Sequence, residues 1–240
     1  MRYTHHFHII RKRKHATPIS IIVLSLILIL IFIFGFREVD AYQFISGFIL
    51  SFFRVTIAYI IALFLSIVIS LIITQKKSVE DIALPTLDVL QSFPSFSILP
   101  LLLTIFHELN LVAITILVLA MIWPILFSIM TGIKSQNPDT LEAASIFGAT
   151  GFKRIIFITL PLIFPSLITG SIVAWGEAWE TILAAEIIIK IPGVGTYLQE
   201  AGKNSQSHIL IIGILLLMAI LFVLNKFFWI PLLNKSTKYQ

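Results

Sequence analysis

The chain consists of long apolar stretches separated by short polar segments. The apolar stretches cover residues 18–36, 44–74, 81–106, 111–130, 155–185 and 209–228. A helix rises about 1.5 Å per residue and the hydrocarbon core of a bilayer is about 30 Å thick, so each stretch is long enough to cross it. The pattern therefore predicts an all-α, polytopic membrane protein with six transmembrane helices.

The third apolar stretch is the most interrupted of the six. Three prolines break it, at Pro85, Pro94 and Pro100. Each proline removes a backbone donor and bends a helix, and free carbonyl groups are costly in lipid, so the bends belong against protein or along a water-filled path. Three serines lie among the prolines, namely Ser92, Ser95 and Ser97. These serines could line such a path, or they could cap the backbone groups that the prolines free.

Composition supports the membrane assignment and excludes several classes of protein. Hydrophobic residues make up 58% of the 240 residues and charged residues only 12%, whereas a soluble domain carries about 25% charged residues. The chain holds no cysteine, which excludes disulfides and thiolate metal sites. The net charge of +5 is gathered in a few clusters, a distribution that reflects membrane topology rather than nucleic-acid binding.

The distribution of lysine and arginine predicts the orientation of the spans. Most of them fall in alternate polar segments, at Arg2, Arg11, Lys12, Arg13, Lys14, Lys76, Lys77, Lys134, Lys153, Arg154, Lys226, Lys235 and Lys238. The segments between these carry only Arg37, Lys190 and Lys203. Because cytoplasmic segments are enriched in lysine and arginine, we expect both termini to be cytoplasmic. The predicted organisation is a cytoplasmic basic tail at 1–17, one transmembrane domain at 18–230 with a cytoplasmic loop at 134–153, and a cytoplasmic tail at 231–240.

Two side chains near the ends of apolar stretches call for an explanation. Arg54 lies inside the second stretch, and an arginine deep in a bilayer costs about 2.5–3.5 kcal/mol on insertion scales. Its side chain either extends to the outer headgroups or lines a pore, and the first interpretation is favoured. Trp229 follows the last stretch, and we expect it to anchor the cytoplasmic end of that span.

The cytoplasmic loop carries the signals of a short helix. Asn137 is a suitable N-cap and Pro138 suits the first helical position. Gly148 lies where a glycine would end this helix, and Gly151 adds a second flexible point. The loop therefore predicts one short helix between two spans.

The same loop carries a long motif with fixed gaps. It reads Glu142-Ala143-Ala144, three residues, Gly148, nine residues, Ile158, one residue and Leu160-Pro161. This resembles the EAA signature of the permeases of binding-protein-dependent ABC importers. The resemblance covers roughly residues 53–204 and implies a type I importer permease in a prokaryotic plasma membrane. The residues that it implicates in coupling to the ATPase are Glu142, Ala143, Ala144, Gly148, Leu160 and Pro161.

The resemblance assigns a role to most of these residues. The loop would form a coupling helix in a groove of the ATP-hydrolysing subunit, where Glu142 pins the helix and contacts the ATPase. Ala143 and Ala144 would let the helix lie flush. Gly148 would make the turn, and Pro161 would set the angle of the next helix.

Two passages resemble the nitrate, sulfonate and taurine branch of this family, namely the proline-rich third stretch and the Pro-Gly-x-Gly loop at Pro192. Glu186 matches a glutamate common in the family just after the fifth helix. The resemblance implies a small anion as the solute. It makes Ser92, Ser95, Ser97 and Glu186 the candidate pathway or outer-gate residues. Glu177 and Glu180 oppose this expectation, because carboxylates should not face an anion without basic partners.

The resemblance also implies partners. These are two copies of an ABC ATPase, a second permease subunit that most simply makes a homodimer, an extracytoplasmic solute-binding protein and membrane lipid. The chain contains no phosphate-binding loop, no nucleophile elbow and no cluster of metal ligands. We therefore expect no enzymatic activity, no cofactor, no metal and no nucleic acid, with ATP used by the partner.

Other interpretations remain open. An ion-coupled secondary transporter could use Glu177, Glu180 and Glu186. An ABC permease could carry a different polar solute. A membrane scaffold without transport activity is a third hypothesis, and an ATPase that co-purifies with the chain would argue against it.

Overall fold

The computed structural model describes residues 25–26 and 39–236. The predicted tail at 1–17 and nearly all of the first predicted span, 18–36, lie outside the described residues. Throughout the described part the chain forms helices and no strands, which confirms the all-α prediction.

The elements follow one another along the chain with short connections. They are α3 (Ala41–Ile73), α4 (Lys77–Gln91), η3 (Ser95–Ile98), α5 (Leu99–Ile105), α6 (Leu109–Lys134), α7 (Pro138–Ile146), α8 (Gly151–Arg154), η4 (Ile155–Thr159), α9 (Leu160–Ile189), α10 (Val194–Lys203), α11 (Ser207–Leu224), η5 (Asn225–Trp229) and α12 (Ile230–Ser236). The segment η3 is a 3₁₀ turn, whereas η4 and η5 are single π-helical turns.

Four helical segments are long and apolar enough to cross a membrane. They are Ala41–Ile73, Leu109–Lys134, Gly151–Ile189 and Ser207–Ser236. A fifth candidate joins α4 to η3 and α5, with a bend of 78° between the two parts. The described residues therefore hold four spans, or five if the bent pair counts as one, and the predicted total of six would need the stretch at 18–36.

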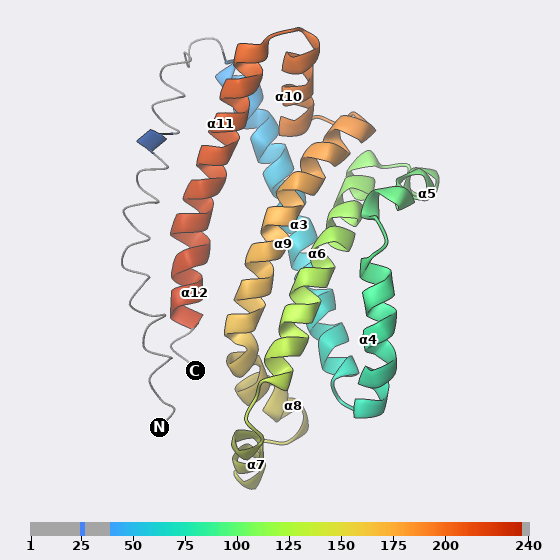
Figure 1. The fold of residues 1–240 in the computed structure, drawn as a ribbon, viewed down its shortest axis with the longest axis vertical. Helices are drawn as coiled ribbons and strands as arrows, with labels where there is room; N and C mark the ends of the chain where they lie inside the picture. The colour runs from blue at the N-terminus through green and yellow to red at the C-terminus, as the bar shows by residue number, and fades with distance from the viewer. Residues whose placement is uncertain (1–24, 27–38, 237–240) are drawn as a thin grey trace, which may run out of the picture.

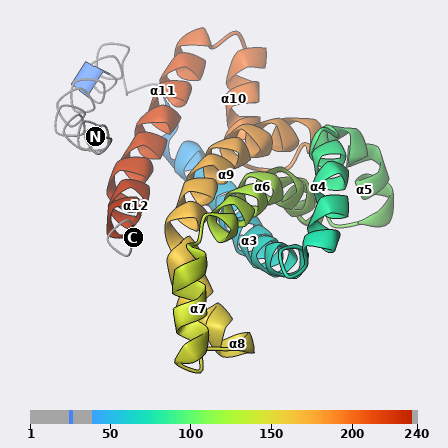
Figure 2. The same ribbon diagram turned by 60° about the horizontal axis from the view of Figure 1, so that its bottom comes forward.

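The bundle has two distinct ends. Figure 1 shows α7 and α8 at one end and α10 at the opposite end, and we call these the α7 end and the α10 end. Figure 2 shows that α7 and α8 project away from the spans. Between the two ends, α6 packs against both α3 and α9. Ile116, Leu117 and Met121 of α6 are fully buried there.

Helices α6 and α9 approach each other closely at Gly170. A Cβ atom added to Gly170 would lie 2.6 Å from the Cβ of Ser128 and 2.8 Å from the carbonyl oxygen of Pro124. Further along α9, Ala174 and Ala178 are also fully buried. Small residues every four positions let two helices pack closely in a membrane, so α6 and α9 behave as one unit.

We expect Gly170→Ala to destabilise the protein by about 1–3 kcal/mol, because the added methyl group overpacks the contact with α6. Gly176→Ala is the matched control. Gly176 lies on the same helix, and a Cβ there would meet nothing within 4 Å. Its replacement should be neutral or should stabilise by up to about 1 kcal/mol, because alanine favours the helix. The midpoint of SDS-induced unfolding of the purified chain measures both, and equal midpoints would contradict the close contact.

The third predicted span is broken in the structure. Helix α4 contains Pro85 and has no buried residue, and Pro94 directly precedes η3. Pro100 lies in the first turn of α5, where a missing N–H costs little. The prolines thus correctly predict an interrupted helix, and the break occurs at Pro94.

The last span differs from the prediction. The helix continues through η5 and α12 to Ser236, so the first residues of the predicted tail at 231–240 are helical. Trp229 is only 2% exposed. Its ring packs edge-on against Tyr59 of α3, at 5.8 Å between ring centroids, and against Trp175 of α9, at 5.7 Å. The prediction that Trp229 anchors the span at the membrane surface is therefore wrong, because its ring joins the last span to the bundle.

Candidate functional site

The loop that the sequence singled out forms helix α7 as predicted. The Asn137 side chain accepts a hydrogen bond from the backbone N–H of Asp139 at 2.9 Å, and Pro138 occupies the first helical position. The cap satisfies one of the N–H groups that a helix start leaves free. The sequence alone thus located the beginning of α7.

Helix α7 ends in a Schellman motif at Gly148. The N–H of Ala149 donates to the carbonyl of Ala144 at 2.9 Å, and the N–H of Gly148 donates to the carbonyl of Ser145 at 3.0 Å. Gly148 has a φ of 79°, in the left-handed region that favours glycine. Gly151 also has a positive φ, of 53°. The predicted end of the helix at Gly148 is therefore confirmed.

The predicted coupling residues lie on and just after α7. Glu142, Ala143 and Gly148 are exposed, whereas Ala144 is buried. Leu160 is half-buried and Pro161 is exposed at the start of α9. The π turn of η4 directly precedes them, in keeping with the backbone donor that Pro161 lacks. Their role in coupling stays a prediction.

Large apolar side chains at the α7 end were not singled out from the sequence. Ile146 is 78% exposed and Phe147 is 90% exposed, and Phe152 is also exposed. Exposed apolar groups on a projecting helix are typical of a surface that meets another protein. The sequence did contain a signal for this surface, because these large apolar residues interrupt an otherwise polar loop.

The α10 end holds a buried carboxylate, Glu186 of α9. Glu186 is fully buried and accepts three hydrogen bonds. The Ser51 hydroxyl donates at 2.6 Å, Nη1 of Arg54 at 2.8 Å, and the backbone N–H of Gly195 at 2.8 Å. The last of these places the carboxylate at the N-terminus of α10, where negative charge is favoured. The donors to the Glu186 carboxylate thus come from α3 on one side and from α10 on the other.

Arg54 completes the network around Glu186. It is only 7% exposed. Its Nη1 also donates to the carbonyl oxygen of Pro192 at 2.7 Å, and its Nε donates to Oδ1 of Asn110 at 2.9 Å. The favoured interpretation, in which this side chain extends to the headgroups, is therefore wrong. The guanidinium instead faces protein, and it connects α3 to the N-terminus of α6 and to the loop before α10.

Glycines make room for this network. A Cβ on Gly193 would overlap the Glu186 carboxylate, and one on Gly195 would lie 2.6 Å from the carbonyl oxygen of Leu183. On α3, a Cβ on Gly47 would lie 3.0 Å from the backbone of Gly193. The Pro-Gly-x-Gly passage therefore lets the backbone approach both Glu186 and α3.

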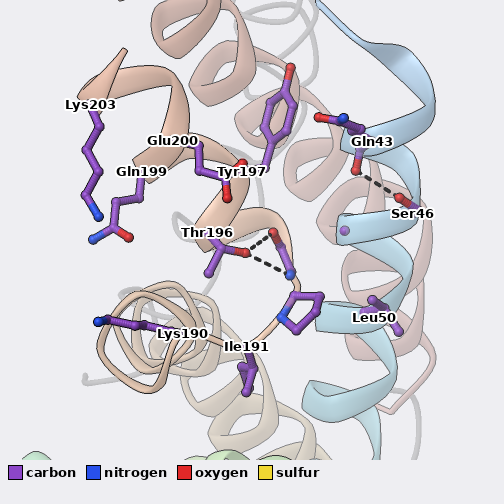
Figure 3. A pocket seen from close by; sticks show the side chains of 13 residues that line it. Gln43, Ser46, Leu50, Lys190, Ile191, Thr196, Tyr197, Gln199, Glu200 and Lys203 are labelled. Atoms are coloured by element: carbon purple, nitrogen blue, oxygen red, sulfur yellow. Dashed lines mark hydrogen bonds between the residues drawn. The ribbon is translucent and has the colours of Figure 1, made fainter. Parts of the chain in front are cut away.

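A polar pocket of about 410 Å³ lies beside this network, between α3 and α10 (Figure 3). Its polar lining includes Gln43, Ser46, Lys190, Thr196, Glu200 and Lys203. The pocket is also lined by Tyr197, whose pKa is raised above its ordinary value by burial and then by the charge of Asp40. The α10 end thus presents a polar, concave surface.

The candidate pathway serines are not part of the Glu186 network, which is built from α3, α6, α9 and α10. Ser92 is exposed, and its hydroxyl donates to the carbonyl of Asp88 at 2.8 Å. This bond goes to the carbonyl four residues earlier, not to one that a proline frees, and the role of Ser92 stays a prediction. Ser95 is half-buried and Ser97 is exposed, both in η3.

Glu177 and Glu180 also lie apart from the network. Both are exposed on α9, and neither forms an ion pair with any described residue.

Over residues 25–26 and 39–236, no group of three or more His, Cys, Asp or Glu side chains is placed to hold a metal ion.

Known proteins match this chain over most of its length. Residues 66–230 match the family described as "Binding-protein-dependent transport system inner membrane component". The chain is 27% identical over 191 residues to the taurine transport system permease protein TauC of Escherichia coli, covering 80% of this chain and 68% of that protein. It is 28% identical over 167 residues to the nitrate import permease protein NrtB of Synechococcus elongatus, covering 68% and 60%.

A third relative is the putative aliphatic sulfonates transport permease protein SsuC of Bacillus subtilis. It is 23% identical over 167 residues, covering 70% of this chain and 60% of that protein. The three relatives confirm the resemblance to the nitrate, sulfonate and taurine branch. The chain spans between 60% and 68% of the length of these relatives.

Proposed function

The chain belongs to the family of inner membrane components of binding-protein-dependent transport systems, and from this premise we propose that it is the permease subunit of an ATP-driven importer of a small anion. Two copies of the chain would form the pathway at their interface. Two ATPase subunits would bind at the α7 end on the cytoplasmic side. An extracytoplasmic binding protein would deliver the solute at the α10 end.

The geometry of α7 carries the proposal. This short helix is capped at both ends and projects beyond the spans, as Figure 2 shows. The exposed Ile146 and Phe147 offer apolar contact area to a groove of the ATPase. A helix fixed at both ends can transmit a displacement, whereas a flexible loop would absorb it.

The connections of α7 supply a route for that displacement. Helix α6 leads into α7 and α9 follows it, and α6 and α9 pack closely at Gly170. When ATP draws the two ATPase subunits together, the two α7 helices would approach each other and tilt the α6–α9 units. Such rocking of rigid units alternates access to a site between them.

The relatives support the solute class. They are named for taurine, nitrate and aliphatic sulfonates, each of which carries an anionic group. We propose a small organic or inorganic anion for this chain. An importer of another polar solute is the alternative, and identification of the ligand of the partner binding protein distinguishes the two.

Energy supply tests the function directly. In vesicles that hold the assembled transporter, we expect uptake to stop when ATP is depleted while the ion gradients are held. ATP should be essential because, in the proposed assembly, the partner ATPase supplies the energy and this chain contains no phosphate-binding loop of its own. Uptake that survives ATP depletion would instead identify an ion-coupled carrier.

Cross-linking tests the place of the ATPase. The chain contains no cysteine, so single cysteines can be introduced without removing others. We expect Ser145→Cys, exposed on α7, to cross-link to the ATPase in the assembled complex. Glu200→Cys, exposed on α10, is the control that should not cross-link. The reverse pattern would place α7 away from the ATPase.

A further inference from the structure

A second pocket lies under α7, where the spans meet the coupling loop. It has a volume of about 560 Å³ and is formed by the ends of α3 and α6, by α7 and by the segment from Gly151 to Thr159. One part of its lining is polar, with Gln75, Gln136 and Arg154. The other part is apolar, with Leu71, Ile133 and Leu141. Neither the coupling role of α7 nor the Glu186 network uses this pocket.

The polar part of the pocket carries an uncompensated positive charge. Arg154 is half-buried and forms no ion pair with any residue that the structure describes. By contrast, Lys134 at the same end pairs with Glu80. No aspartate or glutamate lines the pocket. A guanidinium that is partly removed from water and has no counter-ion is suited to bind an anion.

Two amide side chains add hydrogen-bond donors beside Arg154. Gln136 donates one hydrogen bond from its Nε2 to the carbonyl of Thr159, at 3.4 Å, and its second N–H remains available. Gln75 is exposed, and its side chain makes no hydrogen bond within residues 39–236. A guanidinium with two amides supplies donors for several oxygens of one tetrahedral group, as a phosphate presents.

The depth of the pocket indicates where the phosphate would come from. On α3 the apolar sequence ends just before Gln75, and Lys76 and Lys77 follow. After Arg154 the apolar sequence begins at once with Ile155. The pocket therefore lies where the spans leave the hydrocarbon core, at the level of the lipid headgroups.

We propose that this pocket binds the phosphate group of an anionic phospholipid. Arg154 pairs with the phosphate, and Gln75 and Gln136 donate to its oxygens. The apolar wall at Leu71 and Ile133 receives the glycerol and the first acyl carbons. A lipid held there lies between the end of α3 and α7. It would therefore hold the coupling helix at a fixed distance from the spans.

Lipid retention by the full chain tests the proposal. We expect the purified chain, measured by native mass spectrometry, to retain phosphatidylglycerol in preference to phosphatidylcholine. Arg154→Gln should lower retention of phosphatidylglycerol about tenfold, since it removes a charge-assisted hydrogen bond. Lys153→Gln is the matched control, because Lys153 is the neighbouring cation but does not line the pocket.

A second variant and a soluble anion make the outcome decisive. Gln75→Leu leaves the charge of Arg154 in place. It should lower retention of phosphatidylglycerol by about threefold, because it removes one neutral hydrogen-bond donor. Thermal unfolding of each variant in detergent shows whether it is folded. If the Arg154 and Lys153 variants lose the same amount of bound phosphatidylglycerol, retention depends on surface charge in general, and the proposal is overturned. Stabilisation by inorganic phosphate without preferential retention of phosphatidylglycerol would overturn the lipid assignment and leave a site for a soluble phosphate.

Discussion

Replacing Glu186 with alanine is expected to lower the free energy of unfolding by about 3–5 kcal/mol, the range measured when one partner of a buried ion pair is removed. The substitution leaves the buried Arg54 without its counter-ion. It also deprives the Ser51 hydroxyl and the N–H of Gly195 of their acceptor. SDS-induced unfolding of the purified chain measures the loss.

Two further variants distinguish the effect of breaking the buried ion pair from the effect of removing any glutamate from α9. Glu180→Ala removes an exposed glutamate from the same helix and should change stability by no more than about 0.5 kcal/mol. The double variant Arg54→Met with Glu186→Leu removes both charges. It should recover part of the loss of the single variant, because no unpaired charge stays buried. A Glu186→Ala loss as small as that of Glu180→Ala would show that the pair contributes little.

Replacing Gly148 with aspartate is expected to leave the chain in the membrane but to uncouple it from ATP hydrolysis. Aspartate, like asparagine, is tolerated in the left-handed region better than most residues but less well than glycine, and Gly148 has a φ of 79°. A carboxylate directly after α7 is also unfavourable, because the C-terminus of a helix carries negative charge. Since about 1.4 kcal/mol is a factor of ten, we expect ATP hydrolysis stimulated by the loaded binding protein to fall about tenfold.

The control for this prediction keeps the backbone conformation and omits the charge. Asparagine is tolerated in the left-handed region better than most residues, and a Cβ at Gly148 would meet nothing within 4 Å. Gly148→Asn should therefore retain most of the stimulation. Normal stimulation in the aspartate variant would contradict a coupling role for the end of α7. This result is separate from the ATP-depletion test, which concerns the energy source.

Features encoded within a few residues could be predicted from the sequence. Asn137, Pro138 and Gly148 specify the start and end of α7 through bonds to residues at most five positions away. The apolar stretches likewise predicted the helices, because each span depends on its own composition. The prolines predicted an interrupted third span, but the angle of 78° depends on how α5 packs against α6.

Features that depend on distant partners could not be predicted in this way. Arg54 and Glu186 are 132 positions apart, so each stood in the sequence as an isolated charge with no assigned partner. The one signal in the sequence was the high cost of an unpaired charge in a membrane, which favours pairing of such side chains. Trp229 was mistaken for a surface anchor because its contacts with Tyr59 and Trp175 come from two other helices.

The separation between Arg54 and Glu186 has a consequence for biosynthesis. Helix α3 leaves the ribosome and enters the bilayer long before α9 has been translated, so Arg54 must first be accommodated without its partner, at a cost of about 2.5–3.5 kcal/mol. That cost is relieved only when α9 has been inserted and the loop to α10 has closed over the pair. The nascent chain should therefore acquire resistance to quality-control proteolysis late in synthesis, after its fifth hydrophobic stretch has been integrated.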